Sequence, residues 1–514
     1  MVFMGWAQEG ERERTLIHIV HANQLSKTPG SDALLLKGRV HIRHDSTHFY
    51  CDSAYYYEDK NSFDAFQNVH IKINDSIDMY SRTMKYDGNR RFAEFFDQVR
   101  MMDDSTLLET EYMTYDRNLH QASYPHYGVT TRGDKKLVSD KGFYRDDLKV
   151  FRFIRNVVAT SPKYRMVTDT LYYNTRTERL WFQGGGTMTN ENNQEIVADS
   201  LIYDSQMKVS QATNNIQITD TAYKVIMRGQ YAEVWEKIGF SFATDQAYVM
   251  YYDDPDTLFI ASDTLFYHFK TEYNEEEKLL GRRHVRFYKS DMQGRCDTML
   301  YDMADSTIRM RVDPVLWTDE SQMTGDHIDI RISNHTIDSL FQRGNGFIIS
   351  KDSIEGYNQI NGTELMSKFI DGTIDHVKVT GDAKVISWLR EDDGDLIGIN
   401  KSSAKRMRIT MKDNSISLVR YYESIDETLF PEKDLKESDR YLKGFLWRDD
   451  ERPQSKEEVI YGVKSEELKV KSEQGEMENE EGEPENGNDV TEEGEEEKED
   501  GEEGEEDKTA EEPR

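Results

Sequence analysis

The residues of this 514-residue chain that most often bind metals or act as nucleophiles are its 13 histidines and 2 cysteines. His41, His44, His48 and His70 are close together in the sequence, but no set of histidine, cysteine and aspartate has the spacing of a zinc site. The strand alternation described below places His41 and His70 on the face opposite the apolar side chains. We therefore predict no metal site and no cofactor.

Aspartate followed by serine or threonine is the other recurrent group with chemical potential. These pairs begin at Asp52, Asp169, Asp199, Asp263 and Asp297. A catalytic acid or nucleophile is needed once, in one prepared pocket, whereas a residue repeated in many units serves the structure of each unit. We interpret the aspartates as capping residues of turns or strand edges. The Gly184–Gly186 run is followed by neither a helix nor a lysine, so it is not a phosphate loop. We predict no catalytic residues and no enzymatic activity.

A repeated pair of strands must position these residues. One strand reads VADSLIYD at residues 197–204, with alternating side chains, and related copies place a tyrosine every 29–30 residues or so. The tyrosines are Tyr56, Tyr86, Tyr115, Tyr144, Tyr173 and Tyr203. A second strand precedes each copy by about a dozen residues, as at Gly38–Ile42 and Gln67–Ile73. The Gly, Asn or Gln that opens it is typical of a turn or bulge.

Two strand signals that keep the same period predict the fold class. We expect an all-β protein, an elongated ladder of antiparallel strands in which each unit contacts its neighbours. The repeat runs from Leu16 to Met323, fades after Ile330 and returns at 374–385. Cys51 and Cys296 fall in units far apart along this ladder, so we expect two buried thiols and no disulfide.

Apolar side chains of the repeat form columns on one face. We predict that they stack into a continuous trough lined by Val40, Ile42, Val69, Ile71, Val99, Met101, Val157, Leu171, Leu201, Ile216, Ile218 and Val285. If the trough is closed, these residues are simply the protein core. If it is open along one side, it can hold a lipid.

The charge of the chain is uneven. Its net charge is −33, of which about 19 negative charges in excess lie between Ser465 and the C-terminus. The body is also acidic and has no basic stripe to replace phosphate counterions, so we predict no nucleic-acid partner.

Composition divides the chain into five expected parts. Residues 1–8 resemble the remnant of a signal peptide, and residues 9–175 and 176–425 are expected to be successive β modules. Residues 426–453 are expected to cap the open end of the sheet through Trp447. Residues 454–514 are rich in Glu and Gly and are expected to form a disordered acidic tail.

The alternation of Gly/Asn-Val-x-Ile with Ala-Asp-Ser-Leu-x-Tyr-Asp resembles the OstA-like family, which includes lipopolysaccharide transport protein A and the N-terminal domain of the outer-membrane assembly protein. The resemblance covers most of residues 16–385, and the segment Leu442–Trp447 is similar to long members from Bacteroidetes. It implies a β-jellyroll, or folded sheet, in the periplasm whose interior carries the acyl chains of lipopolysaccharide. The trough residues named above would then contact lipid. The chain is longer than the short bridge protein and lacks the C-terminal barrel strands of the outer-membrane member.

The resemblance also implies partners that join through edge strands. The first strand, Thr15–Ala22, contains no proline and no Asp, Glu, Lys or Arg, so Leu16, Ile17 and Ile19 mark an edge that is open to strand addition. We expect it to pair with an inner-membrane export component. The C-terminal end is expected to be closed, or reserved for an outer-membrane assembly component, so long homopolymers should not form.

Two other functions can be compared with the repeat. A structural or adhesive β-solenoid would have a closed core and no lipid ligand. A carbohydrate-active β-helix enzyme fits poorly, because no cluster of carboxylates interrupts the repeat.

Overall fold

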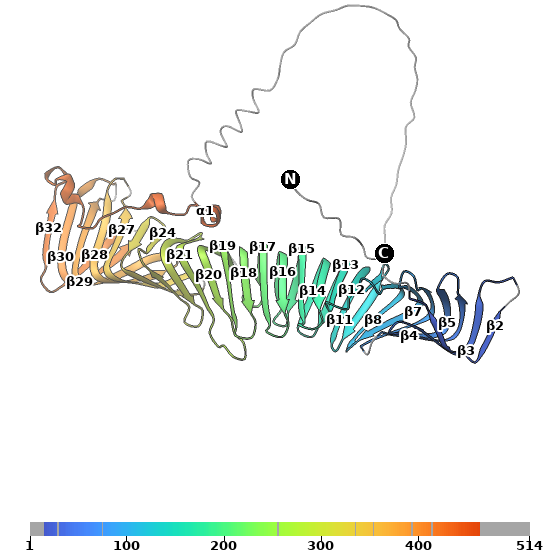
Figure 1. Cartoon of the computed structure of the whole chain (residues 1–514). Helices are drawn as coiled ribbons and strands as arrows, with labels where there is room; N and C mark the ends of the chain where they lie inside the picture. Colours follow the sequence, from blue (N-terminus) through green and yellow to red (C-terminus); the bar gives the residue numbers. More distant parts are fainter. Residues whose placement is uncertain are drawn as a thin grey trace, which may run out of the picture. The chain divides into compact units, whose positions relative to one another are not determined.

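The computed structural model describes residues 15–462, apart from 28–29, 74–75, 254–255, 335, 353, 392–393 and 413–414. The predicted signal remnant, and the acidic tail from residue 463 onward, lie outside these described residues. The described part is a nearly continuous antiparallel sheet in which most strands pair with the next, and a few short strands pair with the next but one or further along (Figure 1). The all-β ladder predicted from the sequence is therefore confirmed.

The strands of the first half of the sheet are β1 (His18–His21), β2 (Gln24–Lys27), β3 (Leu34–His44), β4 (Thr47–Tyr57), β5 (Ser62–Ile73), β6 (Ile77–Asp87), β7 (Phe92–Asp103), β8 (Thr106–Asp116), β9 (Gln121–Tyr124), β10 (Gly128–Arg132), β11 (Lys135–Ser139), β12 (Lys141–Arg145), β13 (Val150–Ser161), β14 (Tyr164–Asn174), β15 (Arg179–Asn190), β16 (Gln194–Asp204), β17 (Val209–Asp220) and β18 (Val225–Trp235). Most of these strands have 11 or 12 residues, whereas β1, β2 and β9–β12 have 4 or 5.

The second half contains longer strands and ends in short helices. Its elements are β19 (Phe240–Asp253), β20 (Asp256–His268), β21 (Lys278–Lys289), β22 (Met292–Asp302), β23 (Thr307–Arg311), β24 (Val315–Thr318), β25 (Ser321–Thr324), β26 (His327–Ser333), β27 (Thr336–Lys351), β28 (Tyr357–Ile370), β29 (Thr373–Arg390), β30 (Leu396–Lys412), β31 (Ser415–Tyr422), β32 (Asp426–Phe430), three 3-10 helices, η1 (Glu432–Asp434), η2 (Glu437–Arg440) and η3 (Asp449–Glu451), and the α-helix α1 (Lys456–Tyr461). The sequence pattern fades after Ile330 because strands β27–β30 are longer than those of the repeat, and the sheet itself continues.

Alternate strands fold at a corner made by two consecutive residues with positive φ. Gln67 and Asn68 interrupt β5 with φ of 63° and 50°, and Gly184 and Gly185 interrupt β15 with φ of 91° and 93°. The pairing register shifts at each corner, for example between Phe66 and Val69. Left-handed backbone favours Gly and Asn, which explains why these residues open the second predicted strand of each unit. The predicted bulge is thus a sharp fold in the sheet.

Each corner divides the sheet into two walls that face each other. Wall A contains segments such as Leu34–Lys37 and Ser53–Tyr57, and wall B contains segments such as Val40–His44 and Thr47–Tyr50. Apolar side chains from both walls form one continuous core along the strands. Phe49 of wall B, for example, packs against Tyr86 of wall A with ring centroids 4.6 Å apart. We call the side opposite the corners, where the turns lie, the mouth.

Three of the five predicted aspartates, Asp52, Asp199 and Asp263, contact corner residues of the next strand. Asp52 accepts a hydrogen bond of 2.8 Å from Nδ2 of Asn68, a corner residue of the next strand. The same contact recurs between Asn156 and Asp140 at 2.8 Å and between Asn215 and Asp199 at 2.7 Å. The structural interpretation of these aspartates agrees with this geometry, although the bond reaches the neighbouring strand and is not local. Cys51 and Cys296 occupy the same small-residue column and are buried free thiols.

Residues 431–462, the return segment, run back along the outer face of wall B from β30 toward β19 (Figure 1). Two fully buried glutamines of the sheet hold the backbone of the return segment. Gln359 donates to the carbonyl of Arg440 and accepts from the amide of Leu442. Gln322 donates to the carbonyl of Leu446 and accepts from the amide of Arg448. Because this face is covered, the strands beneath are buried on both sides, and Trp317 is fully buried on the outer face.

This path corrects two expectations. Residues 426–430 form β32, the last strand itself, and Trp447 packs 5.3 Å from Tyr357 of β28, so the segment 426–453 does not cap the end of the sheet. The body also extends beyond Pro453, because α1 packs on β19–β21 and fully buries Val459. The second expected module continues the first, since β14 pairs with β15 across residues 175–176.

The N-terminal edge is shorter than predicted. Strand β1 begins at His18 and contains Ile19, whereas Leu16 and Ile17 precede it. Ile17 is buried in the core with 4% exposure, so only part of the predicted edge is available to a partner.

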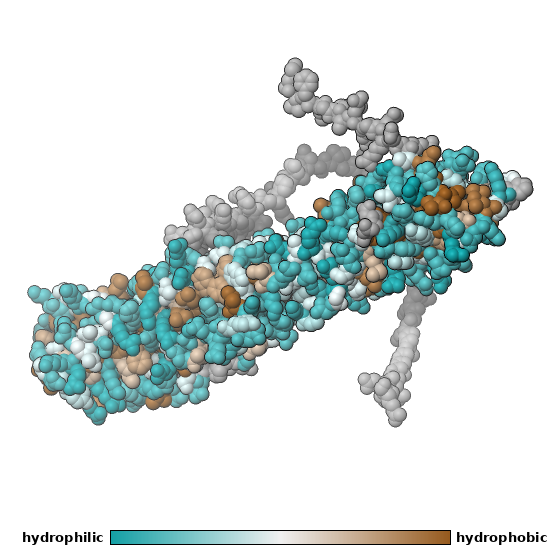
Figure 2. Space-filling view, turned by 60° about the horizontal axis from the view of Figure 1, so that its bottom comes forward, coloured by the Kyte–Doolittle hydropathy of each residue, from teal (hydrophilic) through white to brown (hydrophobic). Residues whose placement is uncertain are grey.

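The surface shown in Figure 2 is mostly hydrophilic, with hydrophobic side chains gathered near the N-terminal end of the sheet. Exposed apolar residues of this end are Leu16, Val20 and Leu25. In the described part of the chain, no helix has the length and apolar character needed to cross a membrane.

Candidate functional site

The predicted trough residues all lie in the interior between the two walls. Their exposure ranges from 0% at Ile42, Val157, Leu171, Leu201 and Val285 to 8% at Ile218. Leu171 and Leu201 belong to wall A and the other ten to wall B. The inward phase read from the sequence therefore matches the structure. Along the first two thirds of the sheet these side chains are packed as a core.

The mouth over the first units is closed by polar contacts between the walls. Asp45, at a wall B turn, pairs with Arg91 at 3.1 Å and Arg117 at 3.6 Å, which come from wall A turns. The hydroxyl of Tyr86 lies 2.7 Å from Nδ1 of His44 and accepts a 2.9 Å hydrogen bond from Arg117. Charged groups thus bridge the mouth above the apolar interior.

The chain start adds to this closure. Asn61, fully buried at a wall A turn, accepts a 3.0 Å hydrogen bond from the amide of Ile17 and donates one of 3.0 Å to the carbonyl of Thr15. The Thr15 hydroxyl lies 2.7 Å from Nε2 of His44, which belongs to wall B. Residues 15–17 therefore cross the mouth of the first units, with Ile17 filling the interior beneath.

Two further bridges follow along the mouth. Asp103 of wall B, 3% exposed, binds Lys149 at 2.6 Å and accepts a hydrogen bond from the Tyr144 hydroxyl. Glu178 of wall A binds Lys135 of wall B at 2.6 Å, and this contact lowers the pKa of Glu178 even though burial opposes the shift.

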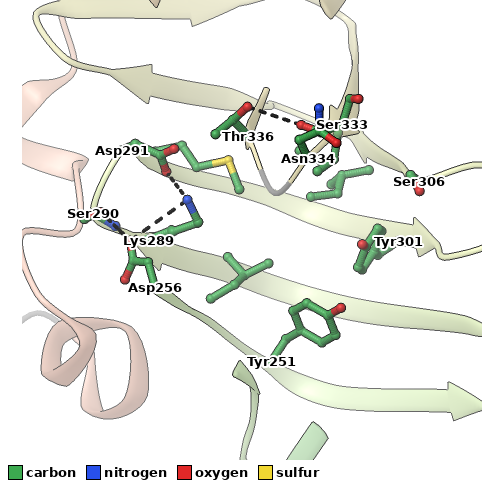
Figure 3. A pocket seen from close by; sticks show the side chains of 14 residues that line it. Tyr251, Asp256, Lys289, Ser290, Asp291, Tyr301, Ser306, Ser333, Asn334 and Thr336 are labelled. Carbon is green, nitrogen blue, oxygen red and sulfur yellow. Dashed lines mark hydrogen bonds and ion pairs between the residues drawn. The ribbon is translucent and has the colours of Figure 1, made fainter. Parts of the chain in front are cut away.

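The mouth opens near the end of the regular repeat. A cavity of about 710 Å³, the mouth pocket, lies between wall B turns at β19–β20 and β21–β22 and wall A turns at β22–β23 and β26–β27 (Figure 3). Its apolar lining consists of Tyr251, Leu258, Met292, Tyr301, Ile308 and Ile332. Leu258, Met292 and Ile308 are members of the continuous core, so the pocket is where the apolar interior reaches the surface.

The rim of the mouth pocket is polar. Lys289 pairs with Asp291 at 2.8 Å and lies 4.0 Å from Asp256 (Figure 3). Burial alone would raise the pKa of Asp256, but hydrogen bonds from the hydroxyl and amide of Ser290, together with the charge of Lys289, lower it overall. Hydroxyl and amide side chains from Ser306, Ser333, Asn334 and Thr336 complete the rim. An apolar floor under a polar rim suits an amphiphile.

The lining of the mouth pocket was not predicted from the sequence. The one available signal was the insertion near Tyr252, which lengthens β19 to 14 residues and β20 to 13, whereas the preceding strands have 11 or 12. A longer hairpin was visible in the sequence, but which wall its tip belongs to depends on the corners.

His41 and His70 lie where the strand alternation placed them, on the outer face of wall B. His41, Tyr50, His70 and Tyr80 stack in a row across neighbouring strands, with centroid separations of 4.5, 5.6 and 4.5 Å. Among the residues that the structure describes, no three His, Cys, Asp or Glu side chains are grouped to hold a metal ion.

Together, the fold and the site define a class of protein, in which an antiparallel sheet folds lengthwise around an apolar interior that opens at a polar mouth. Residues 14–169 match the family described as OstA-like protein. The mouth pocket lies C-terminal to the matched residues. None of the curated proteins matches the chain.

Among solved structures, the chain is similar to the crystal structure of LptH from Pseudomonas aeruginosa, described as the LptA-homologous periplasmic component of its lipopolysaccharide transport device. The two share 14% sequence identity, and the match covers 27% of this chain and 95% of LptH, with a TM-score of 0.23.

Proposed function

We propose that this protein is a non-enzymatic carrier of lipopolysaccharide in the periplasm, acting between the inner and outer membranes. The observation that carries the proposal is the mouth pocket, where the continuous apolar core of an OstA-like chain becomes accessible under a polar rim. An acyl chain entering there exchanges water for apolar contacts, and each buried methylene contributes about 0.8 kcal/mol.

The mechanism is passive. Acyl chains would lie on Leu258, Met292 and Ile308, and the sugar would stay at the rim, where Lys289, Asp256 and Asp291 offer charged and hydrogen-bonding groups. The trough residues toward the N-terminus, such as Ile71 and Ile216, would receive lipid only if the walls separate, because these side chains are now packed. A structural β-solenoid without a ligand is the competing function.

Partners are proposed to join at the ends of the sheet. Strands β1 and β2 pair with β3, and β31 and β32 pair with β30, leaving the outer edge of each pair without a strand among the described residues. Such edges add strands from other sheets. An inner-membrane export component at β1–β2 and an outer-membrane assembly component at β31–β32 fit this arrangement.

A binding measurement with purified lipopolysaccharide tests the proposal. Ile332→Trp fills the mouth pocket with a larger apolar side chain and should weaken binding at least fivefold, whereas Ile370→Trp, at a 53% exposed site, should not. No binding by any of the three proteins would favour the β-solenoid, and equal binding by all three would show that the lipid does not occupy the mouth pocket.

A further inference from the structure

A second cavity at the mouth differs in chemistry from the mouth pocket. This basic pocket, of about 380 Å³, is lined by Ser105, Arg132, Gly133, Asp134, Lys135, Ser161, Lys163, Tyr164, Glu178 and Ser205. It lies between the wall B turns β10–β11 and β13–β14 and the wall A turns β14–β15 and β16–β17. Three cations outnumber two carboxylates there, and three serine hydroxyls accompany them, in a chain whose net charge is −33.

Two of the three cations keep their charge available. Glu178 is matched by Lys135 at 2.6 Å, but it is 3.9 Å from Nε of Arg132. Nη1 of Arg132 donates instead to the neutral hydroxyl of Thr106 at 3.0 Å. Lys163 is exposed and forms no ion pair with any residue of the described ranges. A guanidinium and an ammonium that face one pocket are suited to an anion with several oxygens.

One buried hydroxyl without a partner lines this pocket, and a second belongs to the neighbouring core. Tyr164 lines it with 3% exposure, and Tyr173, within the electrostatic reach of Arg132 and Glu178, is fully buried. Neither hydroxyl has a hydrogen-bond partner among the described residues. Tyr86, Tyr115 and Tyr144 each find one, whereas Tyr203 and Tyr267 do not. Burying an unpaired hydroxyl costs free energy, so it marks a place where a further acceptor belongs.

The two hydroxyls are donors at neutral pH. Burial raises the pKa of Tyr164, and burial together with Glu178 raises the pKa of Tyr173 to about 12 despite the opposing charge of Arg132. Both phenols therefore stay protonated, and each can give a hydrogen bond to an anionic oxygen.

We infer that the basic pocket is a binding site for a phosphate group, held by Arg132, Lys163 and the Tyr164 hydroxyl. The mouth pocket is different in charge, since two carboxylates flank its single lysine. From β14 to β20 there are six strand-to-strand spacings, so the two pockets lie about 29 Å apart along the wall at ordinary strand spacing. The phosphate can belong to a lipid head group or be free in solution.

Titration calorimetry on the full chain tests the site with three probes, namely lipopolysaccharide, the same lipopolysaccharide after enzymatic dephosphorylation, and inorganic phosphate. The unmodified chain should bind the phosphorylated lipid at least tenfold more tightly than the dephosphorylated one. The double variant Arg132→Gln/Lys163→Gln should lose this difference. Lys136→Gln, which removes one positive charge from the exposed outer face of β11, should retain it.

Two single variants sharpen the test. Tyr164→Phe removes only the unpaired hydroxyl, so it should keep the thermal midpoint of the free protein while weakening binding of the phosphorylated lipid about threefold or more. Glu178→Gln removes a negative charge from the pocket and should strengthen that binding. Inorganic phosphate that competes in the millimolar range would identify phosphate itself as sufficient, and failure to compete while the lipid difference persists would assign the site to a lipid head group.

The inference is overturned if the double variant binds phosphorylated lipid and inorganic phosphate as the unmodified chain does, or if phosphorylated and dephosphorylated lipid bind alike and inorganic phosphate does not bind. Neither result touches the mouth pocket, whose occupancy is measured by the Ile332→Trp comparison above.

Discussion

At the scale of single residues, the mouth contains an unusual buried acid. Glu236 follows β18, is 3% exposed, and its carboxylate oxygens have no hydrogen-bond partner within the described ranges. Burial, reinforced by the charge of Glu191, raises its pKa to about 7, although Lys208 opposes the shift. The folded protein therefore holds a proton at Glu236 more tightly than the unfolded chain does.

The sign of the pH dependence follows from this. The cost of burying the ionised carboxylate is absent below its ordinary pKa, grows as the pH rises toward 7, and is complete above it. Glu236→Gln should thus gain stability over the unmodified protein as the pH increases from 5 to 8, by no more than about 3 kcal/mol. Denaturant unfolding at both pH values measures this. Glu195→Gln, at an exposed site of β16, should show no such trend, and a Glu236→Gln curve parallel to the unmodified one would refute the assignment.

The corner residues support a second prediction. Asn156 sits at φ 51° and donates to Asp140. A β-branched side chain is strained in this conformation, so Asn156→Val should lower the free energy of unfolding by about 2–4 kcal/mol, through strain and the lost hydrogen bond. Asn156→Gly should lower it by less, because glycine accepts the conformation. Thr160→Val, in extended backbone of the same strand, serves as the control; a loss as large there would mean that the corner is not special.

At the scale of elements, much of the fold was readable in the sequence. The alternation fixed which side chains face inward, because a strand exposes its two faces with a period of two residues. The Asn, Gln and Gly pairs marked the corners. Periodicity does not reveal how far each half-strand folds over, so the closed mouth above Asp45 and Asp103 and its opening at Leu258 were not predictable.

The return segment was misread for a related reason. Its composition suggested a cap, but where it docks depends on Gln322 and Gln359, two polar residues of the outer face that sequence alone cannot distinguish from solvated ones. Val459 in α1 was assigned to a polar tail because six helical residues give too short a pattern to recognise.

The contribution of α1 can be measured by comparing two shortened chains. A chain ending at Val463 keeps α1, and a chain ending at Pro453 lacks it. Removing Val459 from its buried site should destabilise the fold by about 1.5–3 kcal/mol, so the shorter chain should melt at a lower temperature. Equal thermal midpoints would show that α1 adds nothing to the body.

At the scale of the whole molecule, both ends of the sheet present open edges. Of the two expectations for the C-terminal end, closure is not seen, because β31 and β32 pair only with β30 among the described residues. That this end is reserved for a partner, which would prevent long homopolymers, stays a prediction. Edge strands of this kind are normally protected by charge.

Lysine substitutions test the ends separately. Val20→Lys/Leu25→Lys should abolish binding of an N-terminal partner sheet, and Leu418→Lys/Leu429→Lys should abolish binding at the other end, while each variant keeps its thermal midpoint because all four sites are exposed. Sedimentation of the purified chain reports any head-to-tail assembly, which either pair should suppress. Assembly that persists in both variants would exclude edge pairing.

The most direct test of lipid carriage is site-specific photocrosslinking in cells. A photoreactive residue at Leu258 or Ile308, which are 6% and 1% exposed and line the mouth pocket, should form adducts with lipopolysaccharide. The neighbouring positions Thr257 and Arg309 point to the opposite face of the same strands and should not. Adducts at Leu258 and Ile308 alone would support an amphiphile in the interior, whereas equal labelling at all four positions, or none at any, would contradict it.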